Sequence, residues 1–220
     1  MNQRPAGDDR LLGGRLPLIH PASFDDAQRA LHHRLHVTRV RGAEDAGYAA
    51  VLPDGRLIGP FNAMLRAPEL AGPLLEWAQA IAGSGIPADV REVVVLTVAA
   101  QWRAEYVLYA HTLAAGKAGV PGPAVAALVR GEPPLGMRAE AHVAHRLAVA
   151  LVGDHHVPQG LYDEAVTVFG TDLLVALVNL IGQYLNTSAL LACFRVPAPS
   201  PHHTTQQRHD SPESREQPCL

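Results

Sequence analysis

The chain has 220 residues and 48% of them are hydrophobic, which is enough for one substantial core but short for two. A formal net charge of −3 gives no electrostatic basis for binding nucleic acid. The only cysteines are Cys193 and Cys219, so a disulfide framework is excluded and a reduced, cytoplasmic setting is expected.

Both ends of the chain are expected to be disordered tails. Residues 1–20 are rich in Gly, Pro and Arg, and residues 197–220 lack the apolar side chains that offset the entropy of ordering. Residues 1–10 are polar and no apolar segment follows them, so no secretory signal is expected. A single folded domain is therefore predicted over residues 21–196.

The first part of this domain combines a short helix with an extended segment. Residues 24–37 (FDDAQRALHHRLHV) suit a helix because Asp25 and Asp26 stand at its positive N-terminal end. Residues 48–61 (YAAVLPDGRLIGPF) are predicted to be extended around a turn at the Pro-Asp-Gly sequence.

The rest of the domain is predicted to be helical. Residues 68–83 have apolar positions at helical spacing and end in glycine, and Pro87 suits the start of the next helix. The valines at 93–95 also favour a strand, but no partner strand is apparent, so a helix is expected there. Further helices are expected at residues 123–130, 137–152, 158–169 and 172–194. The predicted fold class is all-α.

The last expected helix, residues 172–194, is about as long as a membrane span. Asp172, Asn179, Gln183 and Asn186 interrupt it at intervals that a lipid-facing helix tolerates poorly. We therefore expect a buried helix in a soluble protein, with no membrane partner. Asn179, Gln183 and Asn186 share one face, which we interpret as a polar seam at a helix or subunit interface; lining of a pocket is the alternative.

Two ionisable residues stand out in the apolar stretch REVVVLTVAAQWRAEYVLYAH, residues 91–111. On one straight helix Glu92 and His111 would lie about 28 Å apart and could not share a site. A chain break at residues 101–103 would let two helices fold back and bring them together. Burial would then raise the pKa of Glu92 and make it a workable acid or base, although a plain ion pair with Arg91, Arg103 or a neighbouring subunit is the alternative. The aromatic residues near the break that could line a pocket are Trp102, Tyr106 and Tyr109.

The remaining histidines are not expected to bind metal. His32 and His36, and likewise His142 and His145, have spacings that place each pair on one helix face. No cysteine or set of carboxylates completes a coordination shell around either pair. We interpret them, together with His33, as surface histidines.

Three segments carry a family resemblance. They are GPFNAMLRAPELAGPLLEWAQAI (residues 59–81), the stretch 91–111 quoted above, and AGKAGVP (residues 115–121). Across roughly residues 57–197 the chain resembles the carboxymuconolactone decarboxylase-like family, which includes the alkylhydroperoxidase D-like proteins. The resemblance implies an all-helical bundle that forms homotrimers or homohexamers and works without metal or organic cofactor.

The resemblance also bears on the chemistry. The peroxidase branch of the family has a Cys-x-x-Cys pair whose positions fall here on Ala104 and Val107, so the thiols needed to reduce peroxide are missing. The decarboxylase-like branch remains, acting on a small conjugated lactone or keto acid as substrate. Glu92 and His111 match the family's glutamate and histidine, and either would supply the proton.

The expected substrate-binding residues surround this pair. Tyr106 or Tyr109 would hydrogen-bond an oxyanion, and Arg91 or Arg103 would orient the substrate carboxylate. The set is completed by Trp102, Glu105 and Tyr184. Two alternatives stay open: an isomerase, dehydratase or cyclase acting on a larger metabolite, and a non-catalytic small-molecule binding protein.

Overall fold

A computed structural model describes residues 9–200, and it is mostly helical. The α-helices are α1 (Asp26–Leu35), α2 (Arg41–Ala46), α3 (Pro60–Met64), α4 (Pro68–Ala82), α5 (Ala88–Trp102), α6 (Glu105–Lys117), α7 (Gly122–Val129), α8 (Ala139–Val149) and α9 (Gln159–Phe194). Within residues 9–200 the only β pairing is an isolated bridge between Val51 and Leu57. The all-α prediction is confirmed. Residues 1–8 and 201–220, where tails were expected, lie outside the described residues.

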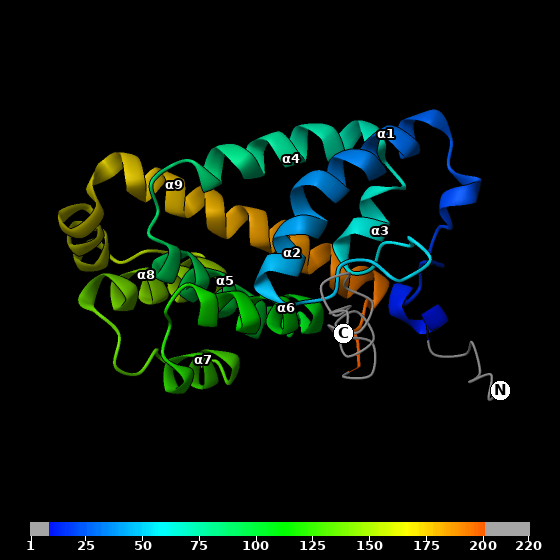
Figure 1. The fold of residues 1–220 in the computed structure, drawn as a ribbon. Helices are drawn as coiled ribbons and strands as arrows, with labels where there is room; N and C mark the ends of the chain where they lie inside the picture. The colour runs from blue at the N-terminus through cyan, green and yellow to red at the C-terminus, as the bar shows by residue number, and fades with distance from the viewer. Residues whose placement is uncertain (1–8, 201–220) are drawn as a thin grey trace, which may run out of the picture.

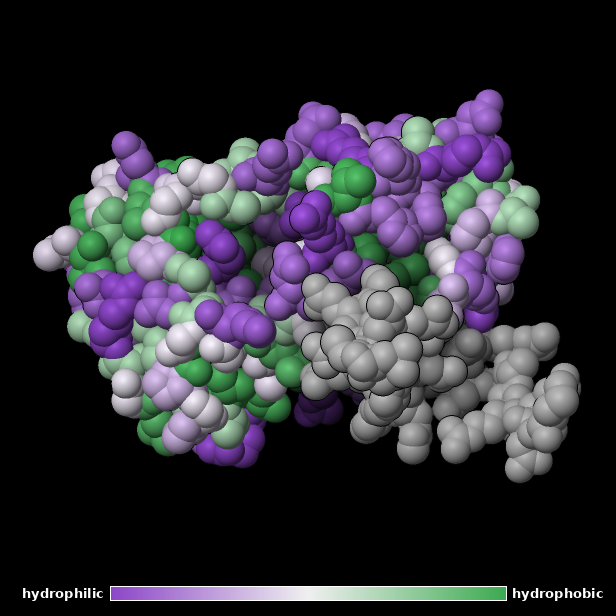
Figure 2. Space-filling view, in the orientation of Figure 1, coloured by the Kyte–Doolittle hydropathy of each residue, from purple (hydrophilic) through white to green (hydrophobic). Residues whose placement is uncertain are grey.

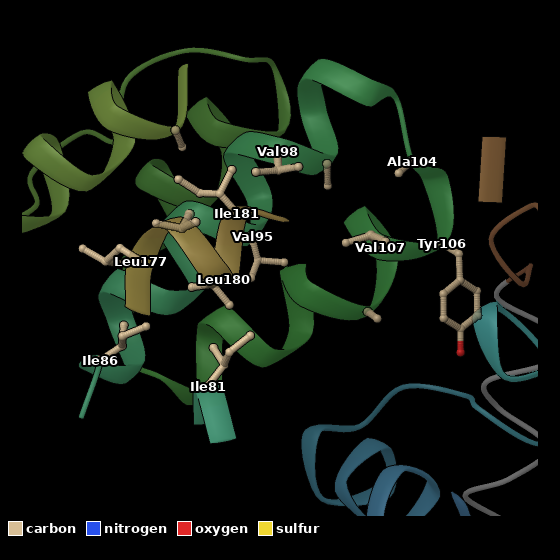
Figure 3. Packing of buried hydrophobic residues seen from close by; sticks show 14 of the residues in the cluster. Ile81, Ile86, Val95, Val98, Ala104, Tyr106, Val107, Leu177, Leu180 and Ile181 are labelled. Carbon is tan, nitrogen blue, oxygen red and sulfur yellow. The ribbon is translucent and has the colours of Figure 1, made fainter. Parts of the chain in front are cut away.

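The bundle is organised around α5 and α9. In Figure 1, α9 runs through the molecule with α4 on one side and α5, α6 and α8 on the other. Helix α5 packs against α6, α7, α8 and α9, which explains why it is apolar around its whole circumference. Figure 3 shows Val95 and Val98 of α5 meeting Leu177, Leu180 and Ile181 of α9 in the main core.

A second structural unit lies at the N-terminal end of the described chain. Asp25 caps α1 through a capping box with Gln28, whose backbone N–H lies 2.8 Å from the Asp25 carboxylate. Helices α1 and α2 are joined through a π-helix, His36–Val40, into one continuous helical rod. This rod ends at Gly47. Its apolar side forms a smaller core with α3, α4 and the segment around the Val51–Leu57 bridge.

A glycine fixes the point where this unit meets the main core. Gly59 has a φ of 63°, and a Cβ at this position would overlap the ring of Tyr106. Figure 3 shows Tyr106 at the edge of the aliphatic cluster, with its hydroxyl turned away from it. The non-helical segment at residues 48–59 is therefore held against α6 by close contact with this ring, and residues 60 and 61, expected to be extended, begin α3.

The ordered N-terminal boundary lies earlier than predicted. Residues 9–20 were assigned to a disordered tail, yet Leu12 is buried in the main core. The backbone N–H of Arg15 donates to the Phe194 carbonyl at 2.7 Å, and its guanidinium donates to the Cys193 carbonyl at 3.0 Å. The last carbonyls of a helix lack partners inside the helix, so the end of α9 provides a docking point that composition alone does not reveal.

Helix α9 is two helices joined at a kink. Gly170 has a non-helical backbone (φ 70°, ψ 166°) at the break expected between residues 169 and 172. Within the described chain, α9 is also the one helix long and apolar enough to cross a membrane, a property shared by core helices of soluble proteins. Its sequence properties alone therefore do not determine where the protein is located.

Candidate active site

The break between α5 and α6 brings the predicted acid–base pair together. Helix α5 ends at Trp102, Arg103 adopts a left-handed conformation with a φ of 50°, and α6 starts at Glu105. The two helices then pack against each other. As a result, Nδ1 of His111 lies 2.7 Å from Oε2 of Glu92. The expected juxtaposition is present.

A third residue extends this pair. The hydroxyl of Tyr184, on α9, lies 3.0 Å from Nε2 of His111, and the two rings meet edge to face with centroids 5.0 Å apart. A Glu92 carboxylate can only accept, so Nδ1 of His111 carries a proton and, in the neutral imidazole, Nε2 accepts from Tyr184. Burial, followed by the charge of Glu92, raises the pKa of Tyr184, which keeps the phenol protonated.

Glu92 itself is buried, with 7% of its surface exposed. Neither Arg91 nor Arg103 forms an ion pair with it among the described residues. Arg91 points elsewhere and donates to the Ala82 and Ile86 carbonyls, both at 3.3 Å. Glu92 therefore acts on His111, fixing which ring nitrogen holds the proton.

A cavity of about 190 Å³ opens beside this chain of hydrogen bonds. His111 and Tyr184 form part of its wall, whereas Glu92 lies behind His111 and does not line it. Most of the wall is apolar. The described lining residues are Arg39, Tyr48, Pro60, Phe61, Met64, Leu74, Leu75, Ala78, Tyr106, Val107, Ala110, His111, Gln183, Tyr184 and Thr187.

Two polar residues of this wall, Arg39 and Tyr48, were not predicted. Arg39 comes from the π-helix His36–Val40 and Tyr48 from the segment after α2. Burial raises the pKa of Tyr48 to about 12, so its hydroxyl is a hydrogen-bond donor at neutral pH. Both residues reach the site only because the N-terminal unit packs on α6 and α9, a long-range event without a local sequence signal.

Tyr106 and Tyr109 hold the wall in place. The Tyr106 hydroxyl donates to the Ala49 carbonyl at 2.7 Å, and the Tyr109 hydroxyl accepts from the Ala49 N–H at 2.9 Å. Both phenols are thus committed to backbone groups next to Tyr48. Tyr106 lines the cavity, but its hydroxyl proton is donated to Ala49, and Tyr109 is not among the described lining residues. Tyr48 and Tyr184 also line the cavity and are better placed than the expected pair to donate to a bound oxygen.

The other expected substrate-binding residues lie away from the cavity. Trp102, Arg103 and Glu105 are exposed at the corner between α5 and α6. None of them, nor Arg91, is among the described residues that line the cavity. The break between α5 and α6 was correctly placed, but the side chains that line the cavity are those of Tyr106, Val107, Ala110 and His111 on α6, together with residues of other elements.

The interpretation of the histidines as surface residues is wrong for His145. Within the described part of the chain, no group of three or more His, Cys, Asp or Glu residues could hold a metal ion. His145, however, is not a surface residue: it is 5% exposed and its Nδ1 lies 2.9 Å from the Thr97 hydroxyl. His145 lies on the side of α8 that packs against α5, whereas His142 is half-buried. The spacing of the two histidines in the sequence did not show this difference.

The polar face of α9 has separate roles rather than forming one seam. Asn179 accepts a hydrogen bond from Nε1 of Trp77 at 3.1 Å, which joins α9 to α4. Gln183 lines the cavity, and Asn186 is exposed. The interpretation as a helix interface therefore applies to Asn179, and the alternative of pocket lining applies to Gln183.

No family model, curated protein or solved structure matches this chain. The family resemblance therefore stays a prediction carried by the quoted segments. The structure shows a small, mostly apolar cavity with a carboxylate–imidazole–phenol chain on one side and Arg39 among its other lining residues. Such an arrangement can transfer a proton without a metal ion.

Proposed function

We propose that this protein is a cofactor-independent acid–base enzyme that decarboxylates a small conjugated lactone or keto acid. The observation that carries the proposal is the hydrogen-bonded chain Glu92–His111–Tyr184, which ends at the wall of an apolar cavity. A buried carboxylate that orients an imidazole is a common way to prepare a proton-transfer group. The resemblance noted in the sequence points to the same chemistry.

Loss of carbon dioxide requires that electrons move into the substrate. The electrons of the breaking carbon–carbon bond pass into the conjugated carbonyl and form an enolate, which then takes a proton on carbon. The apolar wall, with Phe61, Leu74 and Leu75, lowers the hydration of the departing carboxylate and favours its loss as neutral carbon dioxide. A phenol facing the cavity can stabilise the enolate oxygen.

The three-residue chain can deliver the proton. When His111 takes up a proton from solvent, Nδ1–H still donates to Glu92 and Nε2–H donates to the Tyr184 oxygen. The Tyr184 hydroxyl is then free to turn towards the cavity and protonate the substrate carbon, while His111 replaces the proton that Tyr184 gives up. Glu92 stabilises the imidazolium that drives this transfer. One proton is consumed in each turnover and one carbon dioxide is released.

The cavity size separates the proposal from one rival. Pockets for drug-sized ligands span roughly 300–1,000 Å³, whereas this cavity holds about 190 Å³. A small substrate is therefore favoured over the larger metabolite of an isomerase, dehydratase or cyclase. A non-catalytic binding protein would use the same cavity but would not need an oriented imidazole.

The test measures carbon dioxide release and the change in ultraviolet absorbance with purified protein. The substrates are carboxymuconolactone and a panel of unsaturated lactone acids and β-keto acids. We expect turnover in the unsubstituted protein and a loss of about 10²-fold or more in both Glu92→Gln and His111→Ala. Glu105→Gln is the matched control, because this carboxylate is exposed on α6 and does not line the cavity.

The outcomes are separable. Full turnover in Glu92→Gln and His111→Ala would refute the assigned roles. Turnover without carbon dioxide release would support the isomerase class. Absence of turnover on the whole panel, with a folded helical protein that still binds the acids, would support the binding protein.

A further inference from the structure

Arg39 is a cation beside a small and mostly apolar cavity. We infer that Arg39 and the Tyr48 hydroxyl form a carboxylate-recognition site in this cavity, which binds a carboxylate that the substrate keeps through the reaction. That this ligand is a substrate rests on the proposed function, but the binding of a carboxylate does not depend on turnover. The ligands expected at this site are small planar carboxylic acids.

The backbone around Arg39 is specialised. Helices α1 and α2 would form one regular rod, but the π-helix His36–Val40 interrupts it. A π-turn inserts one extra residue and rotates the side chains on one flank relative to those on the other, and such turns are frequent at functional sites. Here the irregular turn carries Arg39, which lines the cavity, while Arg41 at the start of α2 is exposed.

Arg39 has no counter-ion within the described residues. No carboxylate there forms an ion pair with it. Glu92 is the buried carboxylate near the cavity, and its Oε2 is engaged by His111 at 2.7 Å. Arg39 is half-buried and shares the cavity wall with Pro60, Phe61 and Met64, so its charge is less well hydrated than on an open surface. A bound anion would supply the missing partner.

The neighbouring hydroxyl fits the same ligand. Tyr48 lines the same cavity as Arg39. Burial raises the pKa of Tyr48 to about 12, and the positive charge of Arg39 opposes part of that effect. A guanidinium donates two parallel hydrogen bonds to a carboxylate, and a phenol can donate another to the same group. The adjacent rings of Tyr48 and Tyr109, with centroids 6.4 Å apart and edge to face, hold the phenol in position.

The chemistry indicates which carboxylate binds there. An ion pair stabilises a carboxylate in the ground state and therefore slows its loss, so the group held by Arg39 is not the one that departs. The departing carboxylate belongs against the apolar wall. A substrate with two carboxylates, together with a conjugated carbonyl that accepts the electrons, satisfies both requirements.

The test uses matched pairs of small ligands that differ in charge. The probes are 2-furoate with 2-furamide and benzoate with benzamide, titrated against the full chain and followed by ligand-observed nuclear magnetic resonance. We expect each acid to bind about tenfold or more tightly than its amide, and Arg39→Gln to abolish that preference. Arg39→Lys should restore part of it, because a point charge remains but the bidentate geometry is lost. Arg41→Gln, an exposed arginine of the same rod, should change nothing.

The outcomes also separate this inference from the proposed function. Equal binding of acid and amide, no binding of any probe, or an unchanged preference in Arg39→Gln would overturn the recognition site. His111→Ala should keep the preference for acids even though it removes turnover. If the preference is present and depends on Arg39 but no substrate is turned over, the site stands and the enzyme proposal fails.

Discussion

At the scale of single residues, the hydrogen bond between Tyr184 and His111 bears most directly on the proposed proton transfer. Nε2 of His111 is occupied by the Tyr184 hydroxyl at 3.0 Å, so we expect a proton that leaves the imidazole to pass to Tyr184 first. Both rings line the cavity, but the phenol oxygen is the last member of the chain that begins at Glu92. The substrate is thus expected to exchange protons with a phenol rather than directly with a histidine.

Tyr184→Phe tests this order. The variant keeps the edge-to-face ring packing and removes only the oxygen, so we expect kcat to fall about 10²-fold while the free energy of unfolding changes by about 1 kcal/mol or less. Steady-state rates of carbon dioxide release and urea unfolding measure the two effects. Tyr162→Phe on the same helix is the control, since Tyr162 is 45% exposed and outside this cavity. An unchanged kcat in Tyr184→Phe would mean that His111 acts directly.

The residues of the site were unequally predictable from the sequence. Glu92 and His111 could be paired because both lie in one apolar stretch and a chain break between them is a local property. Arg39 and Tyr48 could not, because they reach the cavity through packing of a separate unit and through an irregular turn. Arg103, expected at the α5–α6 corner, does not line the cavity for a related reason: nearness in sequence to a break does not determine which side chains face inward.

At the scale of elements, the kink in α9 sets where Tyr184 points. The first half of α9 packs beside α8, and the second half crosses α5 and carries Gln183, Tyr184 and Thr187 to the cavity. Gly170 at the junction has a φ of 70° and a ψ of 166°, in a region that only glycine adopts readily. A regular helix through this position would change the direction of one half relative to the other.

Gly170→Ala is therefore expected to destabilise the fold, by about 1–3 kcal/mol, because a Cβ strains this backbone conformation whatever space surrounds it. Denaturant unfolding followed by circular dichroism gives the free energy. Gly160→Ala is the matched control: Gly160 lies in a helical stretch of α9, and a Cβ there meets nothing within 4 Å. That change should be neutral or stabilising by up to about 1 kcal/mol. Equal effects at the two positions would contradict the role given to the kink.

The elements themselves were largely predictable. The Asp25 cap, the Pro-Asp-Gly turn and the glycine between residues 169 and 172 are local signals, and each stands at a boundary observed in the structure. The two π-helices, His36–Val40 and Ala150–Asp154, were not foreseen, since their sequences have the same apolar spacing as ordinary helices. The docking of residues 9–20 was missed because it depends on free carbonyls at the end of α9.

At the scale of the whole molecule, hydrophilic and apolar side chains lie on different parts of the surface. Figure 2 shows hydrophilic side chains gathered over α1 and α4. The second half of α9, in contrast, exposes Val175 and Val178 next to a groove formed with Leu151 and Tyr162. Exposed apolar residues of this kind occur at subunit interfaces and at membrane-facing surfaces. A homotrimer or homohexamer in the cytoplasm stays a prediction.

The buried His145 makes the stability of the whole fold depend on pH. Burial, and then the nearby His142, lowers the pKa of His145 below its ordinary value of 6.5. The unfolded chain binds a proton at this residue near that value, whereas the folded protein binds it only at lower pH. The contribution of neutral His145 is therefore complete above about pH 6.5 and is lost as the pH falls towards the folded-state pKa.

His145→Gln removes this titration while keeping a polar group opposite Thr97. The unfolding free energy of the unsubstituted protein should fall between about pH 7 and pH 5, and the fall should be shallower in His145→Gln. It should not disappear, because burial lowers the pKa of His36 in the same direction. His156→Gln is the control, since that histidine is exposed, and its profile should follow the unsubstituted protein. Parallel profiles for all three proteins would show that His145 takes up its proton equally in the folded and unfolded chain, which would contradict its placement between α8 and α5.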